Sequence, residues 1–135
     1  KARPEARVEA ENDALATAAD FCQASTDRTT WFEAALRLFE KVDFMVLPTA
    51  QVFPFDISLR WPREIAGRQM DTYHRWMEVT IPAALAGLPV VSVPVLPEAR
   101  DAASPPHQMT GYQLIGRPQN DYGVLEIAAK VHFSA

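Results

Sequence analysis

Residues 81–95, IPAALAGLPVVSVPV, hold the pattern that decides the fold. The segment carries no charge, and Gly87 separates an alanine-rich half from a half rich in valine and proline. A glycine in this place is typical of the residue that ends a helix in the left-handed conformation. VVSVPV, residues 90–95, is typical of a strand covered on both faces, as in α/β proteins. The stretch therefore predicts a helix, a glycine turn and a buried strand in succession.

Two amphipathic helices are expected toward the N-terminus. Residues 5–24 place Val8, Leu15 and Cys22 on one stripe, which predicts a first helix with Cys22 buried on its face. STDR, residues 25–28, is expected to break this helix and to cap the next one. The apolar stripe of that second helix is then formed by Trp31, Phe32, Ala35, Leu38, Phe39 and Val42.

Further elements are predicted from short apolar runs and from the residues that end or cap them. A strand is expected at 43–48, where Pro48 stops the run DFMVLP, and another at 112–116. Asn120 or Asp121 is expected to begin a last helix. The remaining segments are predicted as a long loop at 49–69, a helical stretch at 70–79 and an irregular connection at 96–110.

Composition limits the class of protein. The chain has 135 residues, of which 48% are hydrophobic and 22% charged. This favours a single globular unit spanning residues 1–135, either one ordinary domain or part of a larger one. The net charge of −4 and the lack of a basic cluster argue against a nucleic-acid partner. We find no apolar run long enough to span a membrane and no signal segment. The lone Cys22 cannot form an internal disulfide, which fits a cytoplasmic location.

The sequence offers no catalytic, metal or cofactor motif of its own. None of its serines lies in a Gly-x-Ser-x-Gly elbow, and no Ser-x-x-Lys occurs. Ser92 stands among valines, where we expect a plain structural role with its hydroxyl bonded to backbone. The histidines are scattered, without the ligand spacing of a metal site, and no glycine-rich phosphate loop follows a strand. We therefore assign no catalytic residue, no metal ligand and no cofactor to this chain.

An aromatic group in the long loop and the following stretch leaves two interpretations open. It consists of Phe53, Phe55, Trp61, Tyr73 and Trp76. These side chains either pack the loop onto the core or form a pocket wall that selects the apolar part of a substrate, because small-molecule pockets favour aromatic linings.

Three segments carry a resemblance to a known family. DFMVLPTAQVFPF, MDTYHRWMEVTIPAALAGLPVVSVPV and GYQLIGRPQNDYGVLEIAA resemble, in this order, the C-terminal third of the amidase-signature hydrolases. The specific points are Asp43 to Thr49, Gly87-Leu88-Pro89 through Val95, and Gly111 to Gly116, where Gln113 and Gly116 are in register with the family pattern. Departures are Leu96-Pro97 in place of a glycine, Ala84 in place of an asparagine, and a longer loop before Gly111.

The resemblance implies a fold class and a function. The fold class is α/β: the C-terminal portion of the amidase-signature fold, with a few mostly buried strands of a mixed sheet flanked by helices. These enzymes hydrolyse carboxylic amides through an acyl-enzyme, with a Ser nucleophile, a second Ser on a cis peptide and a Lys. That machinery belongs to the N-terminal part of the family fold, so the chain alone is expected to be inactive. In the intact enzyme it would line the pocket of a small-molecule amide with Gln51, Phe53, Trp61, Tyr73 and Trp76.

A second interpretation also stays open. The chain could be an amidase-derived binding or assembly module without catalysis. The isolated chain is expected to self-associate, because strands cut from a larger sheet expose unpaired edges. A clean monomer would favour the module that stands alone.

Overall fold

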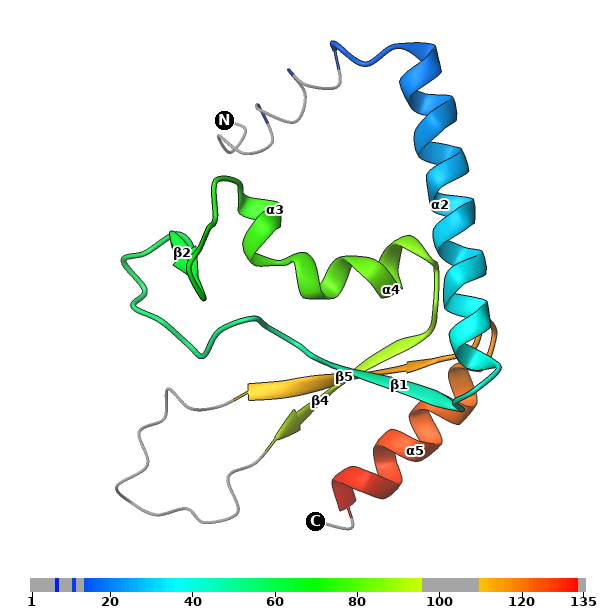
Figure 1. Ribbon diagram of the computed structural model, residues 1–135. Helices are drawn as coiled ribbons and strands as arrows, with labels where there is room; N and C mark the ends of the chain where they lie inside the picture. Colours follow the sequence, from blue (N-terminus) through cyan, green and yellow to red (C-terminus); the bar gives the residue numbers. More distant parts are fainter. Residues whose placement is uncertain (1–6, 8–10, 12–13, 96–109, 134–135) are drawn as a thin grey trace.

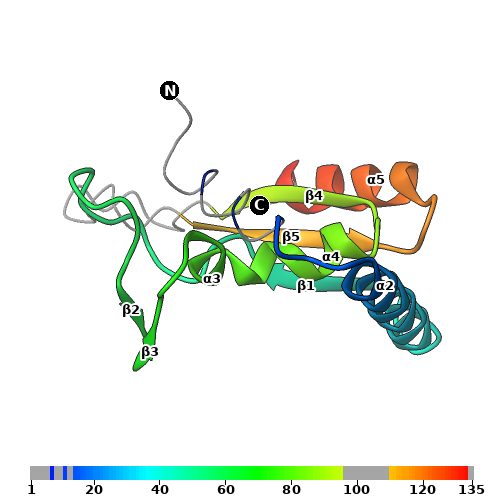
Figure 2. The same cartoon turned by 90° about the horizontal axis from the view of Figure 1, so that it is seen from above.

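The computed structural model describes residues 7, 11, 14–95 and 110–133. Within this part, no helix is both long and apolar enough to cross a membrane. A three-stranded sheet lies between helices, and a separate hairpin of two short strands lies away from it (Figures 1 and 2). The elements are α2 (Ala18–Phe39), β1 (Phe44–Pro48), β2 (Glu64–Ile65), β3 (Arg68–Gln69), α3 (Tyr73–Trp76), the 3₁₀ helix η1 (Glu78–Thr80), α4 (Ile81–Leu85), β4 (Val90–Val95), β5 (Thr110–Gly116) and α5 (Asp121–Phe133).

The sheet has the order β1-β5-β4, and β5 runs antiparallel to both neighbours. Gln113 of β5 pairs with Leu47 on one side and Ser92 on the other. The predicted fold class is confirmed, since helices flank a sheet in an α/β arrangement. Two details differ. The described strands are all antiparallel rather than mixed, and only the central β5 is deeply buried, whereas the edge strand β4 leaves Val90 and Val95 exposed.

Helix α5 covers one face of the sheet (Figure 2). Val93 and Leu114 point from the strands into this layer and meet Val124 and Ala128 of the helix. Gly116 lets the helix approach closely, because a Cβ there would overlap Cγ2 of Val124. Helix and strands are therefore in direct contact on this face.

Helices α2 and α4 cover the opposite face (Figure 2). Ala35 and Phe39 of α2 and Ala83 of α4 pack around Ile115, which is 1% exposed. Two side chains of α2 also bind α4: Trp31 Nε1 donates to Pro82 O at 2.8 Å, and Arg28 Nε donates to Leu85 O at 2.8 Å. Arg28 thereby satisfies a carbonyl that the end of α4 leaves without a helical partner.

Gly87 ends α4 as the sequence predicts. Its φ is +64°, its N–H donates to Ala84 O at 3.1 Å, and the N–H of Leu88 donates to Ala83 O at 3.1 Å. These two bonds define a Schellman motif, in which glycine avoids the steric cost of the left-handed conformation. The turn feeds the chain directly into β4.

The predicted helix break at residues 25–28 is wrong, because α2 runs through it without interruption. The hydroxyls of Thr26, Thr29 and Thr30 each donate to the carbonyl four residues earlier, so the polar run is satisfied inside the helix. The helix begins after Thr17, whose side chain forms a capping box with Asp20, and Leu15 precedes it. Val8 lies outside the described residues.

The burial expected for Cys22 is also wrong. Residues 18–31 of α2 are all exposed, Cys22 among them, because this half of the helix extends beyond the sheet (Figure 1). Only the last turns reach the core, and there the buried positions are Ala35 and Phe39. Leu38 and Val42, which were expected on the buried stripe, are 49% and 42% exposed.

Two other segments are more structured or more divided than predicted. The loop at 49–69 contains the β2–β3 hairpin, whose turn residues Ala66 and Gly67 both have positive φ. The helical stretch at 70–79 is split into α3 and the start of η1. The strands expected at 43–48, 90–95 and 112–116 all form, and α5 begins at Asp121. Most of the connection expected at 96–110 lies outside the described residues.

Candidate functional site: an uncharged pocket at the end of the sheet

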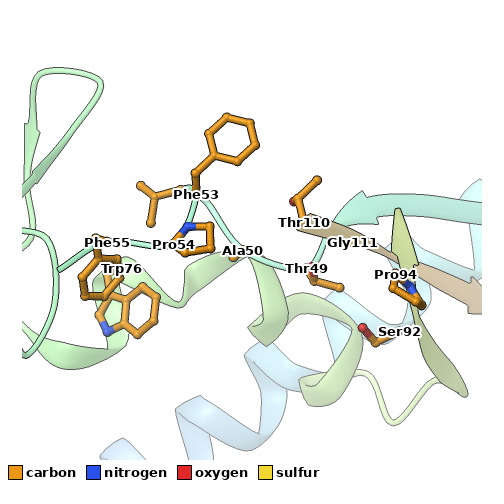
Figure 3. A pocket seen from close by; sticks show the side chains of 11 residues that line it. Thr49, Ala50, Phe53, Pro54, Phe55, Trp76, Ser92, Pro94, Thr110 and Gly111 are labelled. Carbon is orange, nitrogen blue, oxygen red and sulfur yellow. The ribbon is translucent and has the colours of Figure 1, made fainter. Parts of the chain in front are cut away.

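A pocket of about 400 Å³ opens where the three strands meet the 50–55 segment (Figure 3). Because β5 is antiparallel to both neighbours, the C-terminal ends of β1 and β4 lie beside its N-terminal end. This topology brings together residues that are far apart in sequence. The described lining residues are Thr49, Ala50, Val52, Phe53, Pro54, Phe55, Trp76, Ser92, Pro94, Thr110 and Gly111.

The strand ends form one side of the pocket. Thr49 N–H donates to Gly111 O at 3.0 Å, which ties the end of β1 to the start of β5. A Cβ on Gly111 would lie 2.8 Å from Val93 O and 3.1 Å from Thr49 Oγ1, so a side chain here would clash with the backbone of β4. Ser92 lines the pocket from β4 and is exposed. The hydroxyl-bearing residues of the described lining, Thr49, Ser92 and Thr110, all belong to this side.

Aromatic and apolar residues form the other side (Figure 3). Phe55 packs edge-on against Trp76, with ring centroids 5.7 Å apart. Phe53 is 60% exposed at the opening. Trp76 Nε1 is buried and finds no hydrogen-bond partner among the described residues.

Gln51 fixes the aromatic wall in place. Its Nε2 donates to Arg75 O at 2.9 Å and to Trp76 O at 2.6 Å. The carboxamide thus joins the loop after β1 to the C-terminal end of α3 and occupies carbonyls that a short helix leaves free. In the same loop the Ser58 hydroxyl and N–H bond to Asp56 and lower the pKa of that carboxyl below its ordinary value.

Trp61 and Tyr73 lie behind the pocket and are not among its described lining. Their rings meet edge-on at 5.9 Å, and Tyr73 in turn meets Trp76 at 5.9 Å. Trp61 Nε1 donates to Met70 O at 3.1 Å, and the guanidinium of Arg63 lies 4.5 Å from the centre of its ring. The aromatic group is therefore divided: some of its residues line a pocket, and others pack the loop.

The five residues predicted to line a substrate pocket thus gather in one region but differ in position. Phe53 and Trp76 line the pocket, Gln51 supports it, and Trp61 and Tyr73 lie one layer behind. Contact with a substrate stays a prediction for all five. Ser92 also lines the pocket, together with Thr49, Thr110 and Gly111, and the structural role expected for it stays a prediction.

The chemistry of the described lining is limited. It contains no Lys, Arg, His, Asp or Glu, so no general base accompanies its hydroxyl groups. Across the described part of the chain, no three His, Cys, Asp or Glu side chains come together as a metal site would require. The pocket as described can bind a small molecule through apolar contacts and neutral hydrogen bonds.

Comparison with known proteins places the chain in a family. Residues 3–125 match the family model named Amidase. Over 93 residues the chain is 38% identical to a component of the mitochondrial glutamyl-tRNA(Gln) amidotransferase of Coccidioides posadasii, covering 68% of this chain and 17% of that protein. It is 34% identical over 117 residues to a fatty acid amide hydrolase of Medicago truncatula, covering 85% of this chain and 18% of that protein. The chain belongs to the amidase family.

The same arrangement occurs in a solved enzyme structure. A bacterial aryl acylamidase of the amidase-signature enzymes superposes with a TM-score of 0.73 and 23% identity, covering 91% of this chain and 24% of that one. This similarity shows the fold. The chain spans less than a fifth of the length of the two curated relatives and about a quarter of the solved structure.

Proposed function

We propose that this chain is one unit of an amidase-signature hydrolase, its C-terminal part, and that it walls the substrate pocket while other residues of the enzyme cleave the amide. The observation that carries the proposal is the pocket itself, which has an aromatic side, a hydroxyl side and no base among its described lining. The family match over residues 3–125 and the small share of each relative that the chain covers support it.

Amide hydrolysis needs an activated nucleophile and donors that stabilise the developing oxyanion. Ser92 is the serine of the described pocket lining, and that lining contains no Lys or His that could accept its proton. An unassisted serine hydroxyl is a weak nucleophile at neutral pH. We therefore infer that the Ser–cis-Ser–Lys machinery of the family lies outside these 135 residues, and that the chain alone does not turn over amides.

A fluorophosphonate probe, which reacts with activated serines, tests this division of labour. We expect the enzyme that contains this chain to hydrolyse amides and to be labelled at a serine outside residues 1–135. The isolated chain should neither hydrolyse amides nor be labelled, and its S92A variant should behave identically. Labelling of Ser92, or turnover by the isolated chain that S92A abolishes, would contradict the proposal. Absence of both label and turnover in the whole enzyme would favour the non-catalytic binding or assembly module.

We further propose that the isolated chain self-associates. The outer edges of β1 and β4 carry no partner strand among the described residues, and Val46 on β1 is 59% exposed. Unpaired edges with apolar side chains favour pairing with another chain, and a lysine on such an edge opposes it. Sedimentation velocity should show oligomers that V46K reduces. V131K, which alters a 50% exposed valine of α5, is the matched control and should leave them unchanged. A monomeric wild-type chain would contradict this.

A further inference from the structure

The pocket's composition carries an inference about the amide itself. Its described lining has no charged side chain, and its apolar side is built from Phe53, Phe55 and Trp76 (Figure 3). We propose that the pocket takes the neutral aromatic or bulky aliphatic group of an amide and rejects amides that carry charges on that group. The inference rests on the proposed function, because it assigns a substrate class to the same pocket.

Among the described residues, the charged side chains next to the lining in sequence have partners outside the pocket. Asp56, next to Phe55, accepts a hydrogen bond from the Ser58 N–H at 2.7 Å. Arg75, next to Trp76, forms an ion pair with Asp71. Glu78 of η1 forms a two-fold contact with the guanidinium of Arg68 on β3. These pairs lie among exposed or half-exposed side chains outside the described pocket lining. A charged group of a ligand would therefore lose its hydration in the pocket, and the described lining offers no opposite charge to compensate for that loss, which is unfavourable.

The two sides of the pocket also give the bound amide an orientation. Hydroxyls of Thr49, Ser92 and Thr110 can exchange hydrogen bonds with an amide carbonyl or N–H. The edge-to-face arrangement of Phe55 and Trp76 leaves an aromatic wall that favours a third ring or a branched alkyl group. A volume of about 400 Å³ lies within the range of small-molecule sites. The amide group thus faces the strand ends and its apolar substituent faces the 50–55 segment.

Matched amides separate this inference from the alternatives. The enzyme that contains this chain is assayed at pH 7 with 3-phenylpropanamide, which carries a ring on the acyl side, and with N-benzylacetamide, which carries one on the amine side. L-Glutamine, a primary amide of similar reach with two charges, and acetamide, without an apolar group, complete the set. We expect kcat/KM for the better ring-bearing amide to exceed that for L-glutamine about 100-fold.

Two substitutions of the exposed Phe53 then test the pocket wall. F53A should lower kcat/KM for the preferred ring-bearing amide about tenfold and reduce its advantage over acetamide. F53K, which places a cation at the opening, should lower that value further and raise kcat/KM for the anionic amide succinamate. Y122A is the matched control: Tyr122 is an 80% exposed aromatic residue of α5 outside the described pocket lining, and the ratios should not change.

The outcomes distinguish the two proposals. L-Glutamine hydrolysis within tenfold of the ring-bearing amides would overturn the inference while leaving the proposed function standing. Equal loss for every amide in F53A, or no loss for any, would overturn it as well. An enzyme that hydrolyses none of these amides and takes no fluorophosphonate label would overturn the proposed function, and the inference with it.

Discussion

The two faces of the sheet are packed differently. On the α5 face, Val93 and Leu114 meet Val124 and Ala128 directly, and Gly116 removes even a Cβ from the contact. On the α2–α4 face, a cavity of about 300 Å³ lies between Trp31, Ala35, Leu38, Met45 and Ile115, among others. The pocket at the strand ends borders the same face, through Ser92 and Gly111.

This difference separates stability from binding. The face on which α5 and the strands meet directly, called the closed face below, fixes this helix against the sheet, because native cores leave few voids. A face with cavities leaves apolar surface that more protein or a ligand can cover. We therefore expect the α5 face to contribute mainly to stability, whereas the α2–α4 face borders the pocket to which we assign a function.

The largest expected effect is on the closed face, at Gly116. G116A should lower the free energy of unfolding by about 2–3 kcal/mol, because overpacking a tight contact forces backbone or rotamer shifts. The new Cβ would overlap Val124 Cγ2 and also approach Asn120 O and Pro89 Cγ to 3.6 Å. Urea unfolding measures the loss. The double variant G116A/V124A should lose less stability than the sum of the losses of G116A and V124A, because V124A makes room for the new Cβ. A loss equal to that sum would show that the close approach of Gly116 and Val124 is not the cause.

A smaller loss is expected on the open face, at Gln113. Its Nε2 donates to Pro48 O at 2.8 Å and Val79 O at 3.1 Å, and the side chain is only 6% exposed. Q113L removes both bonds and leaves two carbonyls without this donor, which should cost about 2 kcal/mol in urea unfolding. Q69L removes the bond of an exposed glutamine to Glu64 and should cost little. Equal losses would show that the Gln113 bridge does not hold η1 to the sheet.

The elements that the sequence predicts well are those specified locally. Gly87 marks the end of α4 through its own backbone freedom, and VVSVPV forms a strand in its full predicted length. The run STDR misleads because its composition favours a cap, whereas neighbouring threonines bond back to the helix. The prediction that β4 is covered on both faces is not fulfilled within this chain. β4 lies at the edge of the sheet, and this position depends on strand pairing, not on the composition of the strand.

The candidate site was predictable on its aromatic side only. Phe53 and Trp76 stand out in sequence because aromatic residues cluster in a long loop and the segment after it. Ser92, Thr49 and Gly111 come from three different strands or their ends, and only the antiparallel register brings them to one pocket. Nothing in the sequence near Ser92 specifies that register, because it depends on contacts between distant segments.

The same substitution on opposite faces sharpens the comparison further. A35L adds atoms beside the cavity on the α2–α4 face and should raise the free energy of unfolding by about 1 kcal/mol, as cavity filling commonly does. A128L adds the same atoms to the closed α5 face and should lower it by about 1–2 kcal/mol. Both positions lie inside helices, so intrinsic helix propensity changes equally. Changes of the same sign in urea unfolding would contradict the difference between the faces.

The smallest effect is expected where α2 extends beyond both faces, at its first turn. The Thr17 hydroxyl and backbone N–H donate to the Asp20 carboxylate and lower its pKa below the ordinary value of 3.8. A pKa lowered by folding stabilises the folded turn above pH 3.8, and this contribution is lost as the pH falls through the lower folded value. D20N should fray residues 18–22 at pH 7, seen in NMR secondary shifts, and should match the wild type once Asp20 is protonated. D56N, at a loop carboxyl whose pKa is also lowered, should leave this turn unchanged. Equal fraying in D20N and wild type at pH 7 would show that the capping box does not hold the start of α2.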